Sequence, residues 1–376
     1  EFALAGSSIC IATSAAVAQD RPAVYVAPHP GSPTNVQFLT TAQWQRVDES
    51  VDRGLVFLAS QQKSDGSFGP FSAAEPGVTS LCVMAMLARG HQPGKGPYGK
   101  QMERAIDFVL NFQDPNTGAL AETTGREETT AGPYNHAIAG VMLGEVYGMT
   151  NSERHQRIYV AIPKALAYAR QLQQMPKRNP LERGGWRYLR RVTENEADLS
   201  ITVWMLMFLR SARNAEFEVP QLWVEEGLGY VHRSFDEGER GFVYALSGDE
   251  RYCSRGMVGA GVVSLALGGD HQSATAKEAG NWILRSSFRE YNRSRHFEDR
   301  YHYSAFYCSQ AMFQLGGEYW QKFFPELLDV LTRNQMRNGS WPAEAVRDGY
   351  IGNVYSSALA VMTLCTPYQL LPIYQR

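Results

Sequence analysis

A short phrase centred on glycine occurs twice in nearly the same form, once near each end of this chain. Residues 61–69 read Gln-Gln-Lys-Ser-Asp-Gly-Ser-Phe-Gly, and residues 334–341 read Asn-Gln-Met-Arg-Asn-Gly-Ser-Trp. Weaker copies lie at residues 113–120, 183–186 and 240–242, and a degenerate copy lies near Phe297. Successive glycines at positions 66, 118, 185, 241 and 339 are 52, 67, 56 and 98 residues apart, and the last interval holds two units. The chain therefore consists of six units of about fifty residues, a period typical of repeat architectures.

Each unit contains the pattern of two helices. A stretch with apolar residues at three- and four-residue spacing precedes the phrase, as in residues 51–58. The Asp-Gly or Asn-Gly pair then favours a turn, and a second, almost wholly apolar stretch follows. We expect these apolar helices at residues 79–88, 135–147, 200–212, 256–267, 304–315 and 355–364.

The difference in polarity between the two helices of a unit predicts where each one lies. A helix that is apolar all round must be inside, and an amphipathic helix must be outside. Six such hairpins predict an all-α protein, an α/α toroid in which a double ring of helices closes on itself as one domain over residues 45–376. An open helical solenoid is the alternative, and its two terminal units would both need polar caps.

The first residues of the chain differ from the repeats. Residues 2–13 are apolar or small, and Ala16-Val17-Ala18 is followed by polar Gln19 and Asp20. This pattern is typical of the end of a secretory signal peptide with its cleavage site. We therefore interpret residues 1–18 as a signal peptide remnant and residues 19–44 as a linker. The protein is expected to be exported, to the periplasm or the extracellular space. The alternative is a leader that is retained, either disordered or anchoring.

Charge and composition limit the kinds of partner. The chain has 36 Lys+Arg and 38 Asp+Glu, a formal charge of −2, whereas a nucleic-acid partner would require a basic face. No later apolar run is long enough for a transmembrane helix. Cys82, Cys308 and Cys365 lie in apolar helical patterns, which favours reduced, buried thiols. Motifs for nucleotides, zinc proteases and serine hydrolases are absent, so no motif implies a cofactor.

The repeated phrase resembles the repeat shared by squalene–hopene cyclases, oxidosqualene cyclases and protein prenyltransferase β subunits. Residues 184–188, Gly-Gly-Trp-Arg-Tyr, followed by Asp198, Ser200, Thr202 and Trp204, are similar to exported bacterial proteins with prenyltransferase and squalene-oxidase repeats. The endings at residues 355–360 and 371–374 are similar to the same proteins. This resemblance covers about residues 45–376. It implies a toroid whose central cavity binds an apolar small molecule or isoprenoid lipid.

A cyclase needs an acid that protonates an alkene or epoxide, and aromatic faces that stabilise the resulting carbocation. Squalene–hopene cyclases carry an Asp-x-Asp-Asp motif for the first task, and only Asp198 matches it here. Since the inner helices should begin at one mouth of the cavity, we expect Asp198 to be the proton donor, with His136 and His302 as polar partners. The residues expected to bind the ligand are Thr202, Trp204, Tyr301, Tyr303, Tyr307 and Tyr355. Alternatively, Asp198 only caps its helix and the aromatic residues are plain core.

The sequence is also compatible with two other classes of function. In protein prenyltransferases a zinc ion is held by Asp, Cys and His, and the resemblance would place Cys253 and His302 as ligands. The family has Asp two residues before the Cys, where this chain has Arg251, and His302 is equally explained as a hydrogen-bonded residue of the cavity. The other class is a non-catalytic binding or scaffold module, which would hold a partner protein or a glycan.

Overall fold

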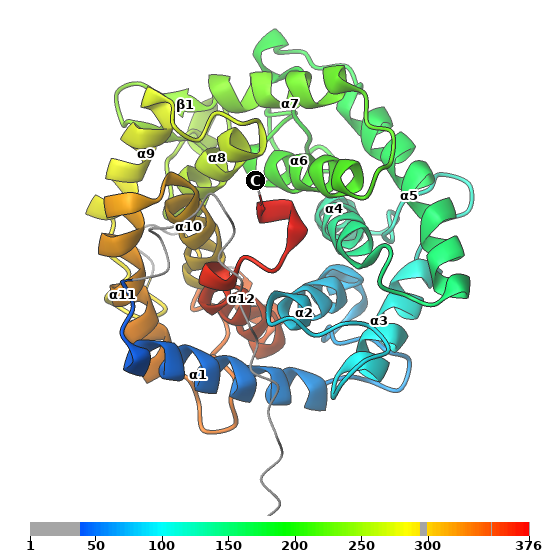
Figure 1. The fold of residues 1–376 in the computed structure, drawn as a ribbon. Coiled ribbons are helices and arrows are strands. Elements are labelled where there is room, and N and C mark those ends of the chain that lie inside the picture. Colours follow the sequence, from blue (N-terminus) through cyan, green and yellow to red (C-terminus); the bar gives the residue numbers. More distant parts are fainter. Residues whose placement is uncertain (1–37, 294–298, 347, 376) are drawn as a thin grey trace, which may run out of the picture.

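The computed structural model describes residues 38–293, 299–346 and 348–375. Over these ranges the chain forms twelve α-helices, and its only paired strands are the short β1 (Phe235–Asp236) and β2 (Gly241–Phe242). Six helices form an outer ring and six an inner ring (Figure 1). The outer helices are α1 (Thr41–Ser60), α3 (Gly99–Asn111), α5 (Ser152–Gln173), α7 (Gln221–Arg233), α9 (Ala274–Arg285) and α11 (Gly317–Arg333). The inner helices are α2 (Gly77–Ala88), α4 (Glu128–Val146), α6 (Leu199–Asn214), α8 (Arg255–Leu267), α10 (Tyr301–Leu315) and α12 (Asn353–Leu364).

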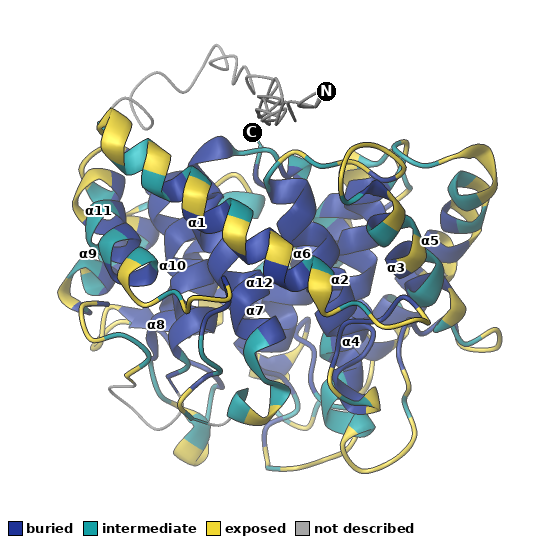
Figure 2. Ribbon diagram, turned by 90° about the horizontal axis from the view of Figure 1, so that it is seen from below, coloured by how far each residue is buried: buried dark blue, intermediate teal, exposed yellow. Residues whose placement is uncertain are grey.

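The ring is closed, which confirms the predicted α/α toroid. Each inner helix packs against the next, and the last one, α12, packs against the first, α2. The outer helix α11 likewise packs against α1, from the opposite end of the chain. The inner helices are buried on all sides, whereas the outer helices expose one face (Figure 2). This is the arrangement expected from the difference in polarity within each unit, and it excludes the open solenoid.

The repeated phrase connects four of the outer helices to the next one around the ring. The amide Nε2 of Gln62 donates to the carbonyl oxygen of Gly66 in its own turn, and also to that of Gln101 in α3. Three further glutamines make the same pair of bonds, the last of them from the end of α11 to α1; they are Gln113, Gln173 and Gln335. Each glutamine therefore ties its own turn to the outer helix of the next unit. The phrase is therefore the joint between successive units.

The aromatic residue of the phrase is anchored to the inner helix that follows it. The backbone amide of Phe68 donates to Thr79 Oγ1 at 2.9 Å, and that of Trp341 donates to Ser357 Oγ at 2.9 Å. The equivalent acceptors in two other units are His136 Nδ1 and Thr202 Oγ1. A polar residue in the first turns of an inner helix thus has a structural function in at least four units.

The two ends of the ring differ. The inner helices begin at one end, and at the other end the C-terminal segment lies against the ends of several inner helices (Figure 1). Glu145 of α4 accepts a bond from the Ile373 amide, and Gln314 of α10 donates to the Tyr374 carbonyl. The last described residues therefore cover this end of the central space.

The predictions for the N-terminal region fall mostly outside the described residues. The signal peptide remnant and most of the linker, and the repeat copy near Phe297, lie outside the described residues. The first helix begins at Thr41 and is capped by Thr40, so the folded domain starts inside the predicted 19–44 linker. Within the described ranges no helix is both long and apolar enough to cross a membrane. Cys82, Cys308 and Cys365 are free and buried, as predicted.

Candidate functional site

A cavity of about 700 Å³ lies where the inner helices begin. Four of these helices contribute a pair of residues one turn apart, four positions along the helix, which places both on the same face. The first member of each pair is small or polar, and the second is apolar. The pairs are Gly77 and Leu81, Tyr134 and Ile138, Ser200 and Trp204, and Tyr355 and Leu359. The cavity is therefore apolar towards the middle of the ring and polar towards its mouth.

Tyrosine is the characteristic residue of the mouth. Seven tyrosines line the cavity, from the inner helices and from the segments that precede them. They are Tyr134, Tyr188, Tyr244, Tyr252, Tyr303, Tyr350 and Tyr355. Several are paired: Tyr244 and Tyr252 stack with centroids 5.5 Å apart, and Tyr350 stacks on Phe71 at 5.6 Å. Such a wall offers aromatic faces to an apolar or cationic group and hydroxyls to a polar group.

The position of Tyr134 depends on an extension of α4 beyond a proline. Pro133 lacks the N–H that would bond the Thr129 carbonyl within the helix. The Leu189 amide donates a hydrogen bond of 2.9 Å to that carbonyl oxygen instead. The helix can therefore begin at Glu128, and the segment before α6 is held against it. As a result the rings of Tyr134 and Tyr188 lie 6.3 Å apart.

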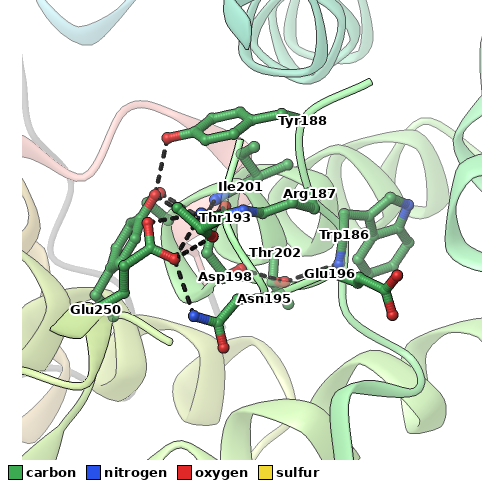
Figure 3. Close-up of polar contacts among 12 residues, drawn as sticks. Trp186, Arg187, Tyr188, Thr193, Asn195, Glu196, Asp198, Ile201, Thr202 and Glu250 are labelled. Carbon is green, nitrogen blue, oxygen red and sulfur yellow. Dashed lines mark hydrogen bonds and ion pairs between the residues drawn. The ribbon is translucent and has the colours of Figure 1, made fainter. Parts of the chain in front are cut away.

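A buried arginine organises one wall of the cavity (Figure 3). Arg187 Nη1 bonds Asp198 Oδ2 at 2.9 Å, and its Nη2 bonds Glu250 Oε1 at 2.8 Å. Its guanidinium also lies 4.5 Å from the ring centroid of Tyr188 and 5.3 Å from that of Tyr244. The two tyrosine hydroxyls are hydrogen-bonded to each other at 2.8 Å. One cation therefore holds two carboxylates and two aromatic rings of the wall in fixed positions.

Asp198 lies behind this wall rather than on it. Its side chain is fully buried, caps α6 through the Ile201 amide and accepts a bond of 2.6 Å from the Ser200 hydroxyl. Ser200 and Tyr134, which do line the cavity, are joined by a bond of 2.5 Å between their hydroxyl oxygens. Burial raises the pKa of Asp198 overall, and the charge of Arg187 and the bonds from Ser200 and Ile201 only partly offset it. Asp198 is thus connected to the cavity indirectly, through Ser200 and through Arg187, whose partners Tyr244 and Glu250 line it.

Glu250 on the wall is held in its charged form. Burial raises the pKa of Glu250, but bonds from Thr193 and Asn195 and the charge of Arg187 outweigh it, so its pKa is lowered overall. Across the cavity Asp348 pairs with Arg300 at 2.5 Å. Asp249 and Glu127 complete the acidic residues of the lining and are exposed. Paired, ionised carboxylates accept hydrogen bonds and do not protonate a ligand.

The structure brings only part of the predicted set to the cavity. Trp204, Tyr303 and Tyr355 line it. Tyr307 lies one layer deeper, packed edge-on against Trp204 at 5.8 Å and Tyr303 at 4.9 Å. Tyr301 does not line the cavity, and its hydroxyl donates a hydrogen bond to the Phe288 carbonyl oxygen. The hydroxyl oxygen of Thr202 accepts the hydrogen bond from the Trp186 amide.

Neither predicted histidine is among the residues that line the cavity. His136 is fully buried and accepts from the Leu120 amide. His302 is also fully buried and pairs with the Tyr291 hydroxyl at 3.2 Å. Burial lowers the pKa of both to about 3, so both imidazoles are neutral at physiological pH. They are placed to support the fold rather than to exchange protons with a ligand.

The predicted zinc ligands do not form a metal site within the described residues. No group of three or more His, Cys, Asp and Glu that could hold a metal ion occurs in that part of the chain. His302 has aromatic neighbours, Tyr291 and Tyr301. Cys253 pairs with Val243 in an isolated bridge, and burial raises the pKa of its thiol to about 12. A zinc ion needs a deprotonated thiolate and further ligands, so these residues do not fit one.

Several residues of the site were not predicted from the sequence. Tyr134, Tyr188, Tyr244, Tyr252 and Tyr350 lie in the segments between helices or before the expected start of α4. One signal was available, because Arg187 and Tyr188 belong to the same phrase, residues 184–188, that suggested the resemblance. The pairing of Arg187 with Glu250, 63 residues later, could not be deduced from it.

Comparisons with known proteins support the fold. No family model and no curated protein sequence matches this chain. Among solved structures, a variant of the type II terpene cyclase MstE from Scytonema, in complex with the substrate geranylgeranyl dihydroxybenzoate, is similar with a TM-score of 0.58 and 14% identity. That similarity covers 89% of this chain and 100% of the cyclase.

Sugar-processing enzymes are similar to the same extent. A variant of the α-1,6-mannanase GH76A of Salegentibacter sp. HEL1_6 has a TM-score of 0.59 and 12% identity, covering 87% of this chain and 99% of the mannanase. A sugar epimerase from a ruminal bacterium has a TM-score of 0.58 and 12% identity, covering 86% of this chain and 98% of the epimerase. The chain therefore has the α/α-toroid fold of these enzymes, and at such low identity the similarity extends to the fold alone.

Proposed function

We propose that this protein binds an apolar, isoprenoid-type molecule in the central cavity of its toroid. The observation that carries the proposal is the graded lining of the cavity. Leu81, Ile138, Trp204 and Leu359 form an apolar interior, and tyrosines surround its mouth. A volume of about 700 Å³ lies within the range of ligand pockets. Such a cavity buries a hydrocarbon chain inside and leaves one polar end at the mouth.

The same geometry supports binding more strongly than acid-initiated cyclisation. A cyclase of this type needs a protonated acid that touches the alkene. Asp198 is separated from the cavity by Ser200 and Tyr134, and its ion pair with Arg187 favours the carboxylate form. We therefore propose a binding function without a proton-donor role for Asp198. The comparison with a terpene cyclase favours a ligand of isoprenoid type, and that with mannanase favours a sugar, which is the alternative tested below.

The test compares a variant with a filled cavity with a surface control. Ala131, a half-buried residue of the cavity lining in α4, is changed to tryptophan, which places an indole in the lumen. The control, Val160→Trp, adds the same side chain on the outer face of α5, where Val160 is 47% exposed. Binding of geranylgeraniol and of α-1,6-mannotriose is measured by calorimetry.

We expect the wild type and Val160→Trp to bind geranylgeraniol and Ala131→Trp to lose at least about tenfold in affinity. Circular dichroism of the variants establishes that each one is folded. Binding of mannotriose without binding of the isoprenoid would replace the proposal with a sugar site. Equal affinity of both tryptophan variants for geranylgeraniol would place the ligand outside the cavity.

We also propose that the protein is exported, on the basis of residues 2–13 and the Ala16-Val17-Ala18 sequence. N-terminal sequencing of the protein recovered from its native host should then give a first residue of Gln19. A native protein that retains residues 1–18 would contradict this proposal.

A further inference from the structure

From the polarity of the cavity mouth we infer that the polar end of the ligand is a protonated amine. The inference rests on the proposed function, because it names the head group of the molecule whose apolar part fills the cavity. It depends on three independent features of the described residues: the direction of the hydrogen bonds, the formal charge of the lining and the aromatic faces.

The hydrogen bonds of Ser200 and Tyr134 leave an acceptor for a ligand at this point of the wall. Asp198 is held as a carboxylate by Arg187 and can only accept, so the single hydroxyl proton of Ser200 is directed to it. Ser200 must then accept the bond that joins it to Tyr134, and the proton of Tyr134 is used in that bond. The phenol oxygen of Tyr134 keeps lone pairs that can accept from a ligand N–H or O–H.

The net charge of the lining also favours a cationic head group. The described residues of the lining include four carboxylates, on Glu127, Asp249, Glu250 and Asp348, and one guanidinium, on Arg300, a formal charge of −3. Arg187 and Asp198 behind the wall add one charge of each sign. Because the cavity is surrounded by protein of low dielectric, this excess attracts a cation and repels a phosphate or a carboxylate.

The aromatic faces of the tyrosines are the third feature that favours a cation. The wall already holds one cation in this way, since the Arg187 guanidinium lies over Tyr188 and Tyr244 while it pairs with Asp198 and Glu250. A cation near an aromatic face gains about 0.5–2 kcal/mol in proteins. An ammonium group at the mouth would find the same combination of tyrosine faces and carboxylates. A diphosphate would meet the excess of negative charge, and the guanidinium of the lining, on Arg300, is already paired with Asp348.

The experiment uses one hydrocarbon tail with three head groups: farnesylamine, farnesol and farnesyl diphosphate. A fourth probe, benzyltrimethylammonium, carries the cation without the tail. Affinities are measured at pH 7 by calorimetry on the wild type. They are also measured on the double variant Glu127→Gln/Asp249→Asn, which removes two exposed charges of the mouth. The control is Glu318→Gln on the outer helix α11, where Glu318 pairs with Lys322.

We expect farnesylamine to bind at least about tenfold more tightly than farnesol, and farnesyl diphosphate to bind most weakly. The double variant should lose part of the preference for the amine and keep its affinity for farnesol, whereas Glu318→Gln should leave both unchanged. Added salt should weaken the amine preference in the wild type.

The outcomes separate this inference from the proposed function. If farnesol binds as tightly as farnesylamine, or the diphosphate binds most tightly, the amine inference is overturned while the apolar cavity function stands. If only benzyltrimethylammonium binds, the cation site stands and the isoprenoid proposal fails. If no probe binds, both are wrong.

Discussion

The two ends of the toroid are built from the same twelve helices but differ in how their turns are packed. At the open end, the turn glycines Gly66, Gly118, Gly184 and Gly339 have positive φ and lie against a carbonyl oxygen of the next outer helix. At the sealed end, Gly148 and Gly269 also have positive φ, but a Cβ there would meet nothing within 4 Å. The open end is therefore held by the repeat itself, and the C-terminal segment covers the other end.

The difference extends to the polar residues. The open end carries ionised carboxylates, tyrosine hydroxyls and the buried Arg187, all fixed by side-chain bonds. The buried carboxylate of the sealed end, Glu145, has no arginine partner and contacts Ser211 and the Ile373 amide. The repeat thus provides a rigid mouth in which polar groups can face a ligand, and the opposite end contributes mainly to stability.

The largest effect is expected from removing the cation of the open end. In Arg187→Met, Asp198 and Glu250 lose their partner, and Asp198 is left buried and charged. Breaking a buried ion pair in this way costs about 3–5 kcal/mol. The control is Arg178→Met, because Arg178 is half exposed and pairs near the surface with exposed Glu194 and half-buried Glu196, where about 0–1 kcal/mol is expected. Urea unfolding measures both, and equal losses would show that Arg187 does not organise the mouth.

A smaller effect is expected from the packing of the turns. In Gly339→Ala the new Cβ would lie 2.3 Å from the Arg53 carbonyl oxygen, at a φ of +88°. We expect a loss of about 3 kcal/mol, from left-handed backbone strain and from displacement of α1. Gly148→Ala at the sealed end, with a φ of +82° and open space, should lose only about 1 kcal/mol. Equal losses in urea unfolding would mean that the turns of the open end do not lock neighbouring outer helices together.

The sequence predicted the ring well and the mouth only in part, for a physical reason. Ring closure depends on local patterns, since each phrase and each apolar helix repeats within about fifty residues. The mouth depends on segments between helices, whose paths are set by contacts such as that of Leu189 with Thr129. Trp204 and Tyr355 were found because they belong to the inner helices. Tyr244 was not, because it reaches the cavity through its bond to Arg187.

His136 shows why a polar residue at a helix start is ambiguous. Its place in the sequence suggested a catalytic partner, but in the structure it accepts the Leu120 amide, as Thr79 accepts the Phe68 amide in the first unit. Counting from the turn glycine places His136 and Ser357 at equivalent positions, 18 residues after Gly118 and Gly339, and Ser357 accepts the Trp341 amide. A repeat-based alignment could therefore have assigned the structural function.

The smallest effect concerns the sealed end and depends on pH. Burial raises the pKa of Glu145 from 4.5 to about 7. A carboxyl whose pKa is raised on folding favours the folded state when it is protonated, so its contribution is full below pH 4.5 and is lost as the pH rises through 7. Between pH 5 and pH 7 the wild type should therefore lose about 2 kcal/mol through this group.

Glu145→Gln cannot ionise and should remove that part of the pH dependence. The buried Glu344, whose pKa burial also raises to about 7, remains in the variant and should leave a residual slope. Unfolding free energies measured by urea at pH 5, 6 and 7 test this, with Glu318→Gln as the exposed control. If the pH slopes of Glu145→Gln and the wild type were identical, Glu145 would have to be ionised throughout, and the C-terminal segment would be held by a charged carboxylate as firmly as the residues of the open end are.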